Sequence, residues 1–547
     1  MQRNLEFMAT KNYDILVIGG GISGAAIAHD AALRGLSVAL VEKADFGGAT
    51  SSATSKLIHG GLRYMKTIEF SLVRESLRER RTMEYIAPHI VAPIPFMVPN
   101  YRKLMQSKLA MVPAMFLYDK LSFDKADLDD IDRKLPGWEN YGSKETLVLE
   151  SGLKQKGLCG SVVYYDCQMF SSERLSLEFI LGAAENGADM ANYTQVKSLL
   201  MDNKCVKGAV VVDVLNNKEF EIRAKTTINA AGPWADYVTD FIGESARKKL
   251  VRSQGIHLIT RKLTNSHALV LTSKTGRIFF IVPWRGLSLI GTTDTRWEGD
   301  PDKYGVQKKD VLHFIDEVNE AYPSANLTLE DVMWTYGGLR PIVEKDTKIE
   351  DVNKASRKYE IYDHKKDDGI SGVISVIGGK YTTSRSLAES VIDMAAFKMN
   401  MPIPSHATAG YILPGGRIGS YAGFRTRIMR DYDVHSDDAI FWTRAYGAHS
   451  IALFEAIKND KKLGEKIDPQ YLETWAVVDR AVTKEMALTL DDVIFRRTGL
   501  GTTGQLSDKS IRSIATRMKN LLGWTQKRTD SEKQQAIAKI KARGMAD

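Results

Sequence analysis

Hydrophobic residues in the first 43 positions fall into blocks that predict a strand, a helix and a second strand. Residues 13–18 form a short apolar run rich in β-formers, which is typical of a buried parallel strand. Residues 25–34 are alanine-rich and predict a helix that ends at Gly35. The apolar run at 36–41 predicts the next strand. This order of strand, helix and strand favours an α/β fold with a parallel sheet.

Two later patterns extend the predicted architecture. The alternating runs at 277–284 and 287–293 predict antiparallel strands joined by a turn at Arg285 and Gly286. Residues 401–547 follow a mostly helical pattern. At 547 residues the chain is too long for one hydrophobic core, so we expect two or three domains.

The turn between the first strand and the first helix carries a dinucleotide-binding fingerprint. Gly19, Gly21 and Gly24 supply G-x-G-x-x-G, which permits a tight turn, close approach of a pyrophosphate and close packing of helix on strand. The helix N-terminus offers N–H groups and a positive dipole end to the phosphates. Glu42 ends the second strand, 18 residues beyond Gly24, where a carboxylate accepts hydrogen bonds from ribose hydroxyls. The segment predicts a dinucleotide site but leaves open whether the ligand is NAD or FAD.

Residues 47–64, GGATSSATSKLIHGGLRY, predict a second ligand-binding segment. Gly60 lets the backbone lie close to a flat ligand, and His59, Arg63 and Tyr64 add titratable and cationic groups. Read alone, the segment also fits a polar loop that caps a helix. The residues whose hydroxyls would serve a pyrophosphate are Thr50, Ser51, Ser52 and Ser55.

Five motifs follow one another along the chain in a specific order. They are ATSSATSKLIHGGLRY (49–64), INAAGPWAD (228–236), IVPWRGLSLIGTTDT (281–295), WTYGGLRP (334–341) and VIGGKYTTSR (376–385). Together they resemble the FAD-dependent glycerol-3-phosphate dehydrogenases, which belong to the glycine oxidase/D-amino-acid oxidase group of flavoproteins. The resemblance runs from residue 13 to about residue 400 and continues through ILPGG (412–416) into an accessory C-terminal domain.

The resemblance implies three domains: a Rossmann-like FAD-binding domain, an antiparallel-sheet substrate cap domain and a mostly helical C-terminal domain with a basic tail. Residues 226–232 and 369–385 support a return of the chain to the FAD-binding domain, because the second segment predicts a strand, a Gly-Gly turn and a helix. We expect the FAD-binding domain at 10–100, 160–255 and 350–400, the cap domain at 101–159 and 256–349, and the C-terminal domain at 401–547.

The implied reaction is oxidation of sn-glycerol 3-phosphate to dihydroxyacetone phosphate by hydride transfer to FAD. A dianionic phosphate needs cations, and arginine suits it because its planar fork binds oxyanions bidentately. Arg340 and Arg357 are expected toward the phosphate, with Arg63 and Lys380 nearer the hydroxyl and the isoalloxazine, and Tyr64 also lining the cavity. The expected FAD contacts are Gly19, Gly21, Gly24, Glu42, Thr50, Ser51, Ser52, Ser55, Gly60, Gly232, Gly378, Gly379 and Lys380.

A histidine is the expected base, because its pKa lies near working pH. His59 and His257 both match family positions, and a water or an arginine-assisted route is the alternative. FAD is expected to be non-covalent, with His59 as a conceivable attachment point. The chain departs from the family in one respect: Thr275 and Gly276 stand where an acidic residue tends to precede the next arginine. This departure leaves the assignment of supporting roles open.

Membrane quinone is the electron acceptor that the resemblance favours, and oxygen, with release of hydrogen peroxide, is the alternative. A flavoenzyme acting on an amino acid stays open because fold does not fix function. A flavin-binding module without turnover also stays open, although the intact set of cations and histidines argues against it. The apolar patch of Met105, Met111, Met115 and Phe116 suits either a membrane-facing surface or the core of the cap domain.

The formal net charge of +8 is concentrated near the C-terminus, where residues 507–547 carry ten Lys/Arg and four Asp/Glu. Ile511, Ile514 and Met518 recur there at helical spacing, which fits a helix lying on an anionic membrane or one docked on the protein. Stacking aromatic residues are few among the basic ones, so no nucleic-acid partner is expected. A homodimer stays open.

The remaining composition points to a reducing compartment. The three cysteines form no C-x-x-C pair, so neither a disulfide framework nor a metal site is expected. Residues 1–12 lack the apolar core of a signal peptide, and the longest apolar stretch, 109–118, is too short to span a bilayer. We therefore expect a cytoplasmic enzyme peripherally associated with the inner face of the cytoplasmic membrane.

Overall fold

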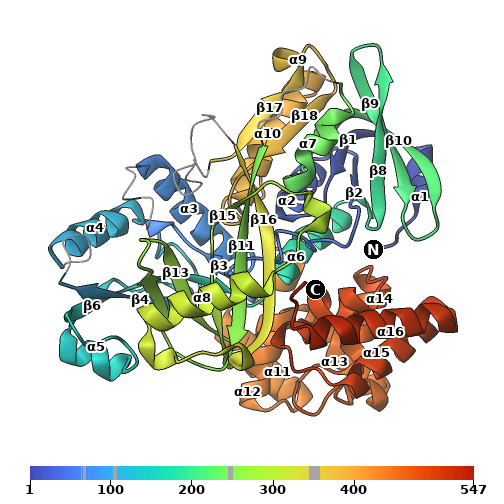
Figure 1. Cartoon of the computed structure of the whole chain (residues 1–547). Helices are drawn as coiled ribbons and strands as arrows, with labels where there is room; N and C mark the ends of the chain where they lie inside the picture. The colour runs from blue at the N-terminus through green and yellow to red at the C-terminus, as the bar shows by residue number, and fades with distance from the viewer. Residues whose placement is uncertain (63–64, 66–68, 103–107, 244–249, 344–357, 547) are drawn as a thin grey trace.

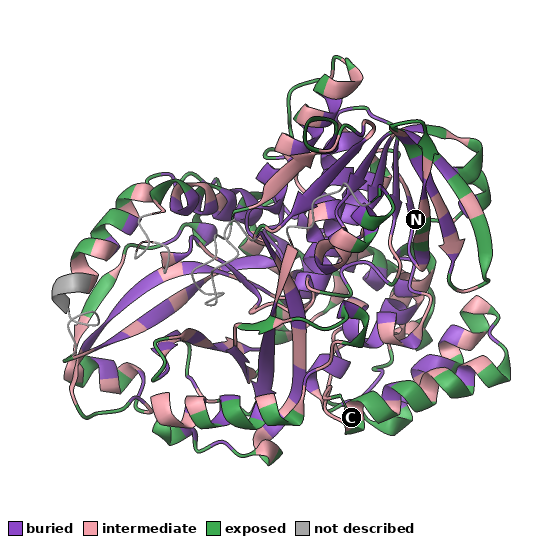
Figure 2. Cartoon of the chain, turned by 45° about the horizontal axis from the view of Figure 1, so that its top comes forward, coloured by how far each residue is buried: buried purple, intermediate pink, exposed green. Residues whose placement is uncertain are grey.

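The computed structural model describes residues 1–62, 65, 69–102, 108–243, 250–343 and 358–546. Two sheets, one of eight strands and one of ten, form the body of an α/β fold, and a helical region follows them (Figure 1). This is the Rossmann-like domain, antiparallel-sheet domain and helical C-terminal domain that the sequence predicts. The strands of both sheets are largely buried, whereas the surrounding helices expose their outer faces (Figure 2).

The first sheet is built on parallel strands around β1. Its order is β17-β18-β10-β1-β2-β7, and β8 and β9 extend it through antiparallel pairing with β10. Both predicted N-terminal strands are confirmed, because β1 pairs in parallel with β2 and with β10. The strands are β1 (Asn12–Ile18), β2 (Val38–Val41), β7 (Asp189–Ala191), β8 (Thr194–Asp202), β9 (Cys205–Asp213), β10 (Lys218–Asn229), β17 (Glu360–Asp363) and β18 (Val373–Ile377).

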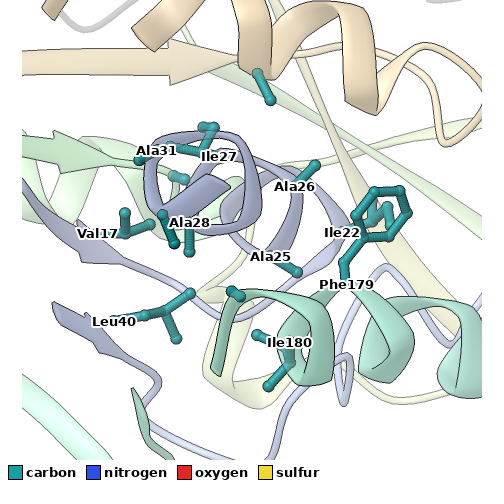
Figure 3. Packing of buried hydrophobic residues seen from close by; sticks show 14 of the residues in the cluster. Val17, Ile22, Ala25, Ala26, Ile27, Ala28, Ala31, Leu40, Phe179 and Ile180 are labelled. Carbon is teal, nitrogen blue, oxygen red and sulfur yellow. The ribbon is translucent and has the colours of Figure 1, made fainter. Parts of the chain in front are cut away.

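Helices cover both faces of this sheet. On one face α2 (Ile22–Leu33) packs against α6 (Ser172–Glu185) and α10 (Ser384–Met399). The alanines of α2 allow this close packing: Ala28 lies toward Val17 of β1 and Ala25 lies beside α6 (Figure 3). On the other face, α1 (Leu5–Thr10) and α7 (Ala235–Asp240) contribute residues to a second core cluster. The short α9 (His364–Asp367) packs against β17 and β18.

The second sheet is mainly antiparallel and has the order β15-β11-β14-β13-β12-β4-β6-β3, with β16 on β11 and β5 on β6. The predicted hairpin is confirmed: β13 pairs antiparallel with β14, and Arg285 and Gly286 form the turn with positive φ. The strands are β3 (Leu57–Ile58), β4 (Val91–Tyr101), β5 (Glu139–Gly142), β6 (Leu158–Met169), β11 (Leu250–Thr260), β12 (Ala268–Thr272), β13 (Ile278–Trp284), β14 (Leu287–Gly291), β15 (Thr295–Trp297) and β16 (Val332–Val343).

The predicted segment limits do not coincide with the limits of the sheets. Most of β4 and most of β6 fall within 10–100 and 160–255, yet both strands belong to the second sheet. Residues 91–101 of β4 pair antiparallel with residues 158–169 of β6, and β4 also pairs with β12. Figure 1 shows β11 and β16 running between the first sheet and the rest of the second. The helices around the second sheet are α3 (Phe70–Ile86), α4 (Lys108–Leu121), α5 (Ser143–Leu149) and α8 (Lys308–Ala321).

The C-terminal region is helical, as its pattern predicts. Its helices are α11 (Tyr421–Tyr432), α12 (Ser436–Tyr446), α13 (His449–Asn459), α14 (Trp475–Lys484), α15 (Asp508–Leu522) and α16 (Gln526–Lys541), with a π-helix at Asp492–Arg497. The apolar face of α15 is buried in the protein, since Ile511, Ile514 and Met518 belong to a core cluster with Ile494. This helix is therefore docked on the protein. Among the described residues, no helix is both long and apolar enough to cross a membrane.

Candidate active site

The turn between β1 and α2 has no room for side chains at two of its three fingerprint glycines. Gly19 has a φ of +108°, and a Cβ there would lie 2.6 Å from the carbonyl oxygen of Ala230. At Gly24 a Cβ would lie 1.9 Å from the carbonyl oxygen of Gly19. At Gly21 the nearest atom would be Ser51 Oγ, at 3.2 Å. The bare backbone of this turn gives a pyrophosphate close access to the start of α2.

Two polar side chains lie at the same end of α2. The carboxylate of Glu42 accepts hydrogen bonds from Gly20 N at 2.6 Å and from Ala44 N at 2.9 Å. Burial raises the pKa of Glu42, and these two N–H groups oppose the rise. Ser51 Oγ accepts from Ile22 N, in the first turn of α2, at 2.9 Å. Both side chains therefore border the place where a helix N-terminus binds phosphates.

The hydroxyl-rich loop connects this turn to the second sheet. Thr50 Oγ1 donates to the carbonyl oxygen of Leu339 in β16 at 2.6 Å. Ser55 Oγ lies 3.0 Å from His257 Nε2 in β11. Ser52 Oγ donates within the loop, to Ala49 O at 2.8 Å. The loop thus brings the fingerprint turn and the face of β11 and β16 together.

One face of β11 and β16 carries two of the predicted catalytic residues. Tyr336 of β16 donates its hydroxyl to Thr54 O at 2.8 Å, and its ring stacks on His257 with centroids 4.9 Å apart. Arg340 lies four residues beyond Tyr336 in β16, and because side chains alternate between the two faces of a strand, both lie on the same face. Its guanidinium lies over Gly255 of β11, where a Cβ would be 1.9 Å from Nη2. The missing side chain at Gly255 therefore makes room for Arg340 beside His257.

His257 is a buried, neutral imidazole. Its exposed fraction is 1%, and Nδ1 has no hydrogen-bond partner among the described residues. Burial first, and then Arg340 and Lys56, hold the pKa of His257 well below 6.5. Because buried polar atoms are nearly always paired, Nδ1 marks a position where a polar atom of a ligand can bind.

Arg340 is oriented by the segment that follows β14. Nη2 donates to Thr292 Oγ1 at 2.6 Å, and Nη1 lies 3.3 Å from Thr293 O and 3.4 Å from Asp294 Oδ1. Three acceptors on consecutive residues hold the guanidinium in one orientation. Its side chain remains 25% exposed, which leaves a surface for an anion.

The turn around His59 packs against β6 and α4. Gly60 N donates to Asp166 Oδ1 at 3.3 Å, and a Cβ at Gly60 would lie 2.3 Å from Tyr118 Oη. His59 Nδ1 accepts from Gly61 N at 3.1 Å. A neutral imidazole that accepts at Nδ1 carries its proton on Nε2, so His59 in this state donates at Nε2 rather than accepts.

The turn that follows β18 lies against the His59 turn. Gly378 and Gly379 both have positive φ, and His59 N donates to Thr382 Oγ1 at 3.4 Å. Lys380 Nζ donates to Ser76 Oγ of α3 at 3.0 Å. The structure therefore places Lys380 and His59 on adjoining turns.

Some predicted residues cannot be placed in the same way. Arg63, Tyr64 and Arg357, together with Met105 of the apolar patch, lie outside the described residues. Gly232 has a positive φ and lies two residues beyond Ala230, which contacts Gly19.

The sequence did not identify several residues that support the site. Lys56 is only 1% exposed, its Nζ lies 3.0 Å from Glu173 Oε2, and it is one of the causes of the low pKa of His257. Thr292 and Asp294 stand in the GTTDT motif, and this was the one signal that could have identified them. Thr292 O also accepts from Arg277 Nη1 at 2.6 Å.

The missing acidic residue before Arg277 has a substitute in the fold. Glu317 of α8 forms an ion pair with the Arg277 guanidinium. Thr275 and Gly276 are therefore compatible with an oriented Arg277, because the carboxylate comes from a different element.

These residues fit FAD as a group. The side-chain-free glycine turn suits its pyrophosphate and the Glu42 carboxylate suits a ribose. The ring of His257 meets the loop through Nε2, which leaves Nδ1 unpartnered among the described residues.

Comparison with known proteins agrees with this geometry. A family model described as FAD dependent oxidoreductase matches residues 14–385. A second model, described as the C-terminal domain of alpha-glycerophosphate oxidase, matches residues 406–529.

Individual relatives cover nearly the whole chain. A glycerol-3-phosphate dehydrogenase of a Synechocystis species is 35% identical and covers 97% of this chain and 96% of its own. An aerobic glycerol-3-phosphate dehydrogenase of Staphylococcus aureus is 32% identical over 89% of this chain and 86% of its own. The solved glycerol-3-phosphate dehydrogenase of Bacillus halodurans, complexed with FAD, superposes with a TM-score of 0.79 at 28% identity, covering 98% and 96% of the two chains. The chain has FAD as its cofactor and belongs to the FAD-dependent glycerol-3-phosphate dehydrogenases.

Proposed function

We propose that this protein oxidises sn-glycerol 3-phosphate to dihydroxyacetone phosphate and passes the electrons from FAD to a membrane quinone. The choice of glycerol 3-phosphate as the substrate rests on the similarity over most of the chain to relatives named glycerol-3-phosphate dehydrogenase. When bound, FAD supplies the acceptor for the hydride of the carbinol carbon. The first sheet with α2, α6 and α10 would hold FAD, and the second sheet would cover the substrate.

Arg340 binds the phosphate in this proposal. Its guanidinium is positioned over Gly255 and held by Thr292, so it does not have to be ordered when the anion arrives. A planar fork suits two phosphate oxygens at once. Arg357 would share the phosphate, and Arg63 and Tyr64 would complete the cavity.

His257 is the base that its surroundings favour. Its low pKa keeps the imidazole neutral, and a neutral imidazole can take the hydroxyl proton as the hydride leaves. Ser55 at Nε2 fixes the ring orientation. His59 would donate a hydrogen bond from Nε2 instead, and Lys380 on the adjoining turn would add positive charge near the flavin.

A surface beside α4 supports membrane docking. Phe116 is 58% exposed and Phe123, two residues beyond α4, is 74% exposed, with Lys120 close to the Phe116 ring. Met115 is buried in a core cluster, so the methionine is not part of this surface. Exposed aromatic residues next to lysine suit an anionic membrane interface.

Reoxidation tests the electron acceptor. The substrate-reduced enzyme is mixed either with air-saturated buffer or, without oxygen, with a water-soluble quinone, and return of the oxidised flavin absorbance is followed. We expect the quinone to restore absorbance at least about tenfold faster than oxygen at equal concentration. Faster return of the flavin absorbance in air, with formation of hydrogen peroxide, would identify the protein as an oxidase. An oxidase is what the description of the family model for residues 406–529 names.

A further inference from the structure

The loop from Glu42 to Gly48 contacts the glycine turn along its length. Gly47 N donates to the carbonyl oxygen of Gly20 at 2.9 Å. Phe46 is 1% exposed, and a Cβ at Gly20 would lie 2.8 Å from its ring. With the bond from Gly20 N to Glu42, these contacts make the position of the loop and the position of the glycine turn depend on each other.

The other side of this loop is held through one buried carboxylate. Asp45 accepts from Arg497 Nη1 at 2.7 Å and Nη2 at 2.9 Å, from Arg496 Nε at 2.7 Å and from Asn192 Nδ2 at 2.9 Å. Its side chain is completely buried. Burial alone would raise the pKa of Asp45, but Arg497 and Arg496 hold it at about 2. The carboxylate is therefore charged and is bound by four donors.

Both arginines belong to the C-terminal region. Arg497 lies 452 residues after Asp45 in the sequence. They end the π-helix Asp492–Arg497. Arg497 also donates to the carbonyl oxygen of Glu485, and Arg496 pairs with Asp492, so the two guanidinium groups are fixed within their own domain. This makes the connection rigid at both ends.

We propose that the Arg496–Arg497 pair is a positioning clamp for FAD. By holding Asp45, the C-terminal domain fixes the loop from Glu42 to Gly48, and with it the Glu42 carboxylate and the glycine turn that meet the adenosine half of the cofactor. The inference rests on the proposed role of Glu42 at the ribose. It gives the helical C-terminal domain a part in cofactor retention, although neither arginine touches the substrate.

The test measures how fast FAD leaves the holoenzyme. Free flavin fluoresces more strongly than bound flavin, so release after dilution is followed by fluorescence, and KM is determined separately for FAD and for glycerol 3-phosphate. The variants are Arg497→Met, Arg497→Lys and Asp45→Asn. Asp479→Asn is the control, because Asp479 of α14 accepts from Arg517 of α15 at 2.6 Å and this ion pair lies within the C-terminal region.

We expect Arg497→Met and Asp45→Asn to release FAD at least about tenfold faster, with a matching rise of KM for FAD. Arg497→Lys should restore part of the retention, since it keeps the charge but not the paired donors. KM for glycerol 3-phosphate should not move, and Asp479→Asn should retain FAD as the wild type does. If Asp45→Asn does not fold, the two Arg497 variants still decide.

The proposed clamp would be overturned if Arg497→Met released FAD at the same rate as the wild type. Equally fast release in Asp479→Asn would also overturn it, because the effect would then follow from general destabilisation of the C-terminal domain. Glu42→Gln separates the two proposals: if it retains FAD like the wild type, the ribose assignment fails, whereas faster release in Arg497→Met still supports a clamp that acts through the glycine turn.

Discussion

At residue scale, the proposed role of His257 as the base requires a neutral imidazole. Because its pKa lies well below 6.5, the imidazole stays able to accept a proton as the solution becomes mildly acidic. We expect the rate of flavin reduction by glycerol 3-phosphate to change little between about pH 8 and about pH 6, and to fall at lower pH. His257→Gln should lower this rate by about a hundredfold or more in rapid-mixing experiments.

Two further variants make that result specific. His313→Gln, at an exposed position whose side chain is 77% accessible, should leave the rate unchanged. A large loss in His59→Gln together with a small one in His257→Gln would transfer the role of base to His59.

A second buried imidazole, His29 in α2, makes a prediction about stability. It packs against Phe179 and Tyr411, and neither ring nitrogen has a hydrogen-bond partner among the described residues. Burial lowers the pKa of His29 from 6.5 to about 3. Below pH 6.5 the unfolded chain therefore binds a proton that the folded chain does not, so stability falls as the pH falls toward 3.

We expect His29→Leu to remove this acid sensitivity. Between about pH 7 and about pH 5 the free energy of unfolding of the wild type should drop by about 2 kcal/mol more than that of the variant. Denaturant unfolding at the two pH values measures the difference. Parallel losses in both proteins would show that His29 is protonated in the folded state.

At the scale of elements, the glycine turn decides whether β1 and α2 can pack and bind FAD. In Gly24→Ala the new Cβ would meet the backbone of Gly19 at 1.9 Å, so the helix must shift away from the strand. We expect a loss of about 1–3 kcal/mol in stability and a lower FAD content after purification, read from the ratio of flavin to protein absorbance. Gly137→Ala is the control, since a Cβ there has no atom within 4 Å. Full FAD content in Gly24→Ala would contradict this reading of the turn.

Elements whose partners are close in sequence could be predicted, and those with distant partners could not. The turn after β1 and the hairpin at Arg285 and Gly286 follow from local glycine positions and alternation. The contact of Ser55 with His257 spans 202 residues, and it depends on where β11 lies in the second sheet. The contact of Asp45 with Arg497 likewise depends on domain packing, which no local pattern encodes.

At the scale of the whole molecule, the proposed membrane contact rests on the surface beside α4, with its exposed rings Phe116 and Phe123. Replacing Phe116 and Phe123 by serine should weaken binding to vesicles that contain anionic lipid by about tenfold or more. The reason is that the two rings would no longer bury apolar surface in the lipid. Co-sedimentation with the vesicles measures this. Phe397→Ser is the matched control: that ring is 86% exposed on α10 and should not contribute. Equal binding by the wild type and the double variant would place the membrane contact elsewhere or exclude it.

Anaerobic mixing of the FAD-loaded protein with sn-glycerol 3-phosphate tests the proposed oxidation, and the absorbance of the oxidised flavin is followed. We expect rapid bleaching with formation of dihydroxyacetone phosphate, and no bleaching with amino acids of similar size. An unchanged flavin spectrum with glycerol 3-phosphate, or bleaching by an amino acid instead, would contradict it.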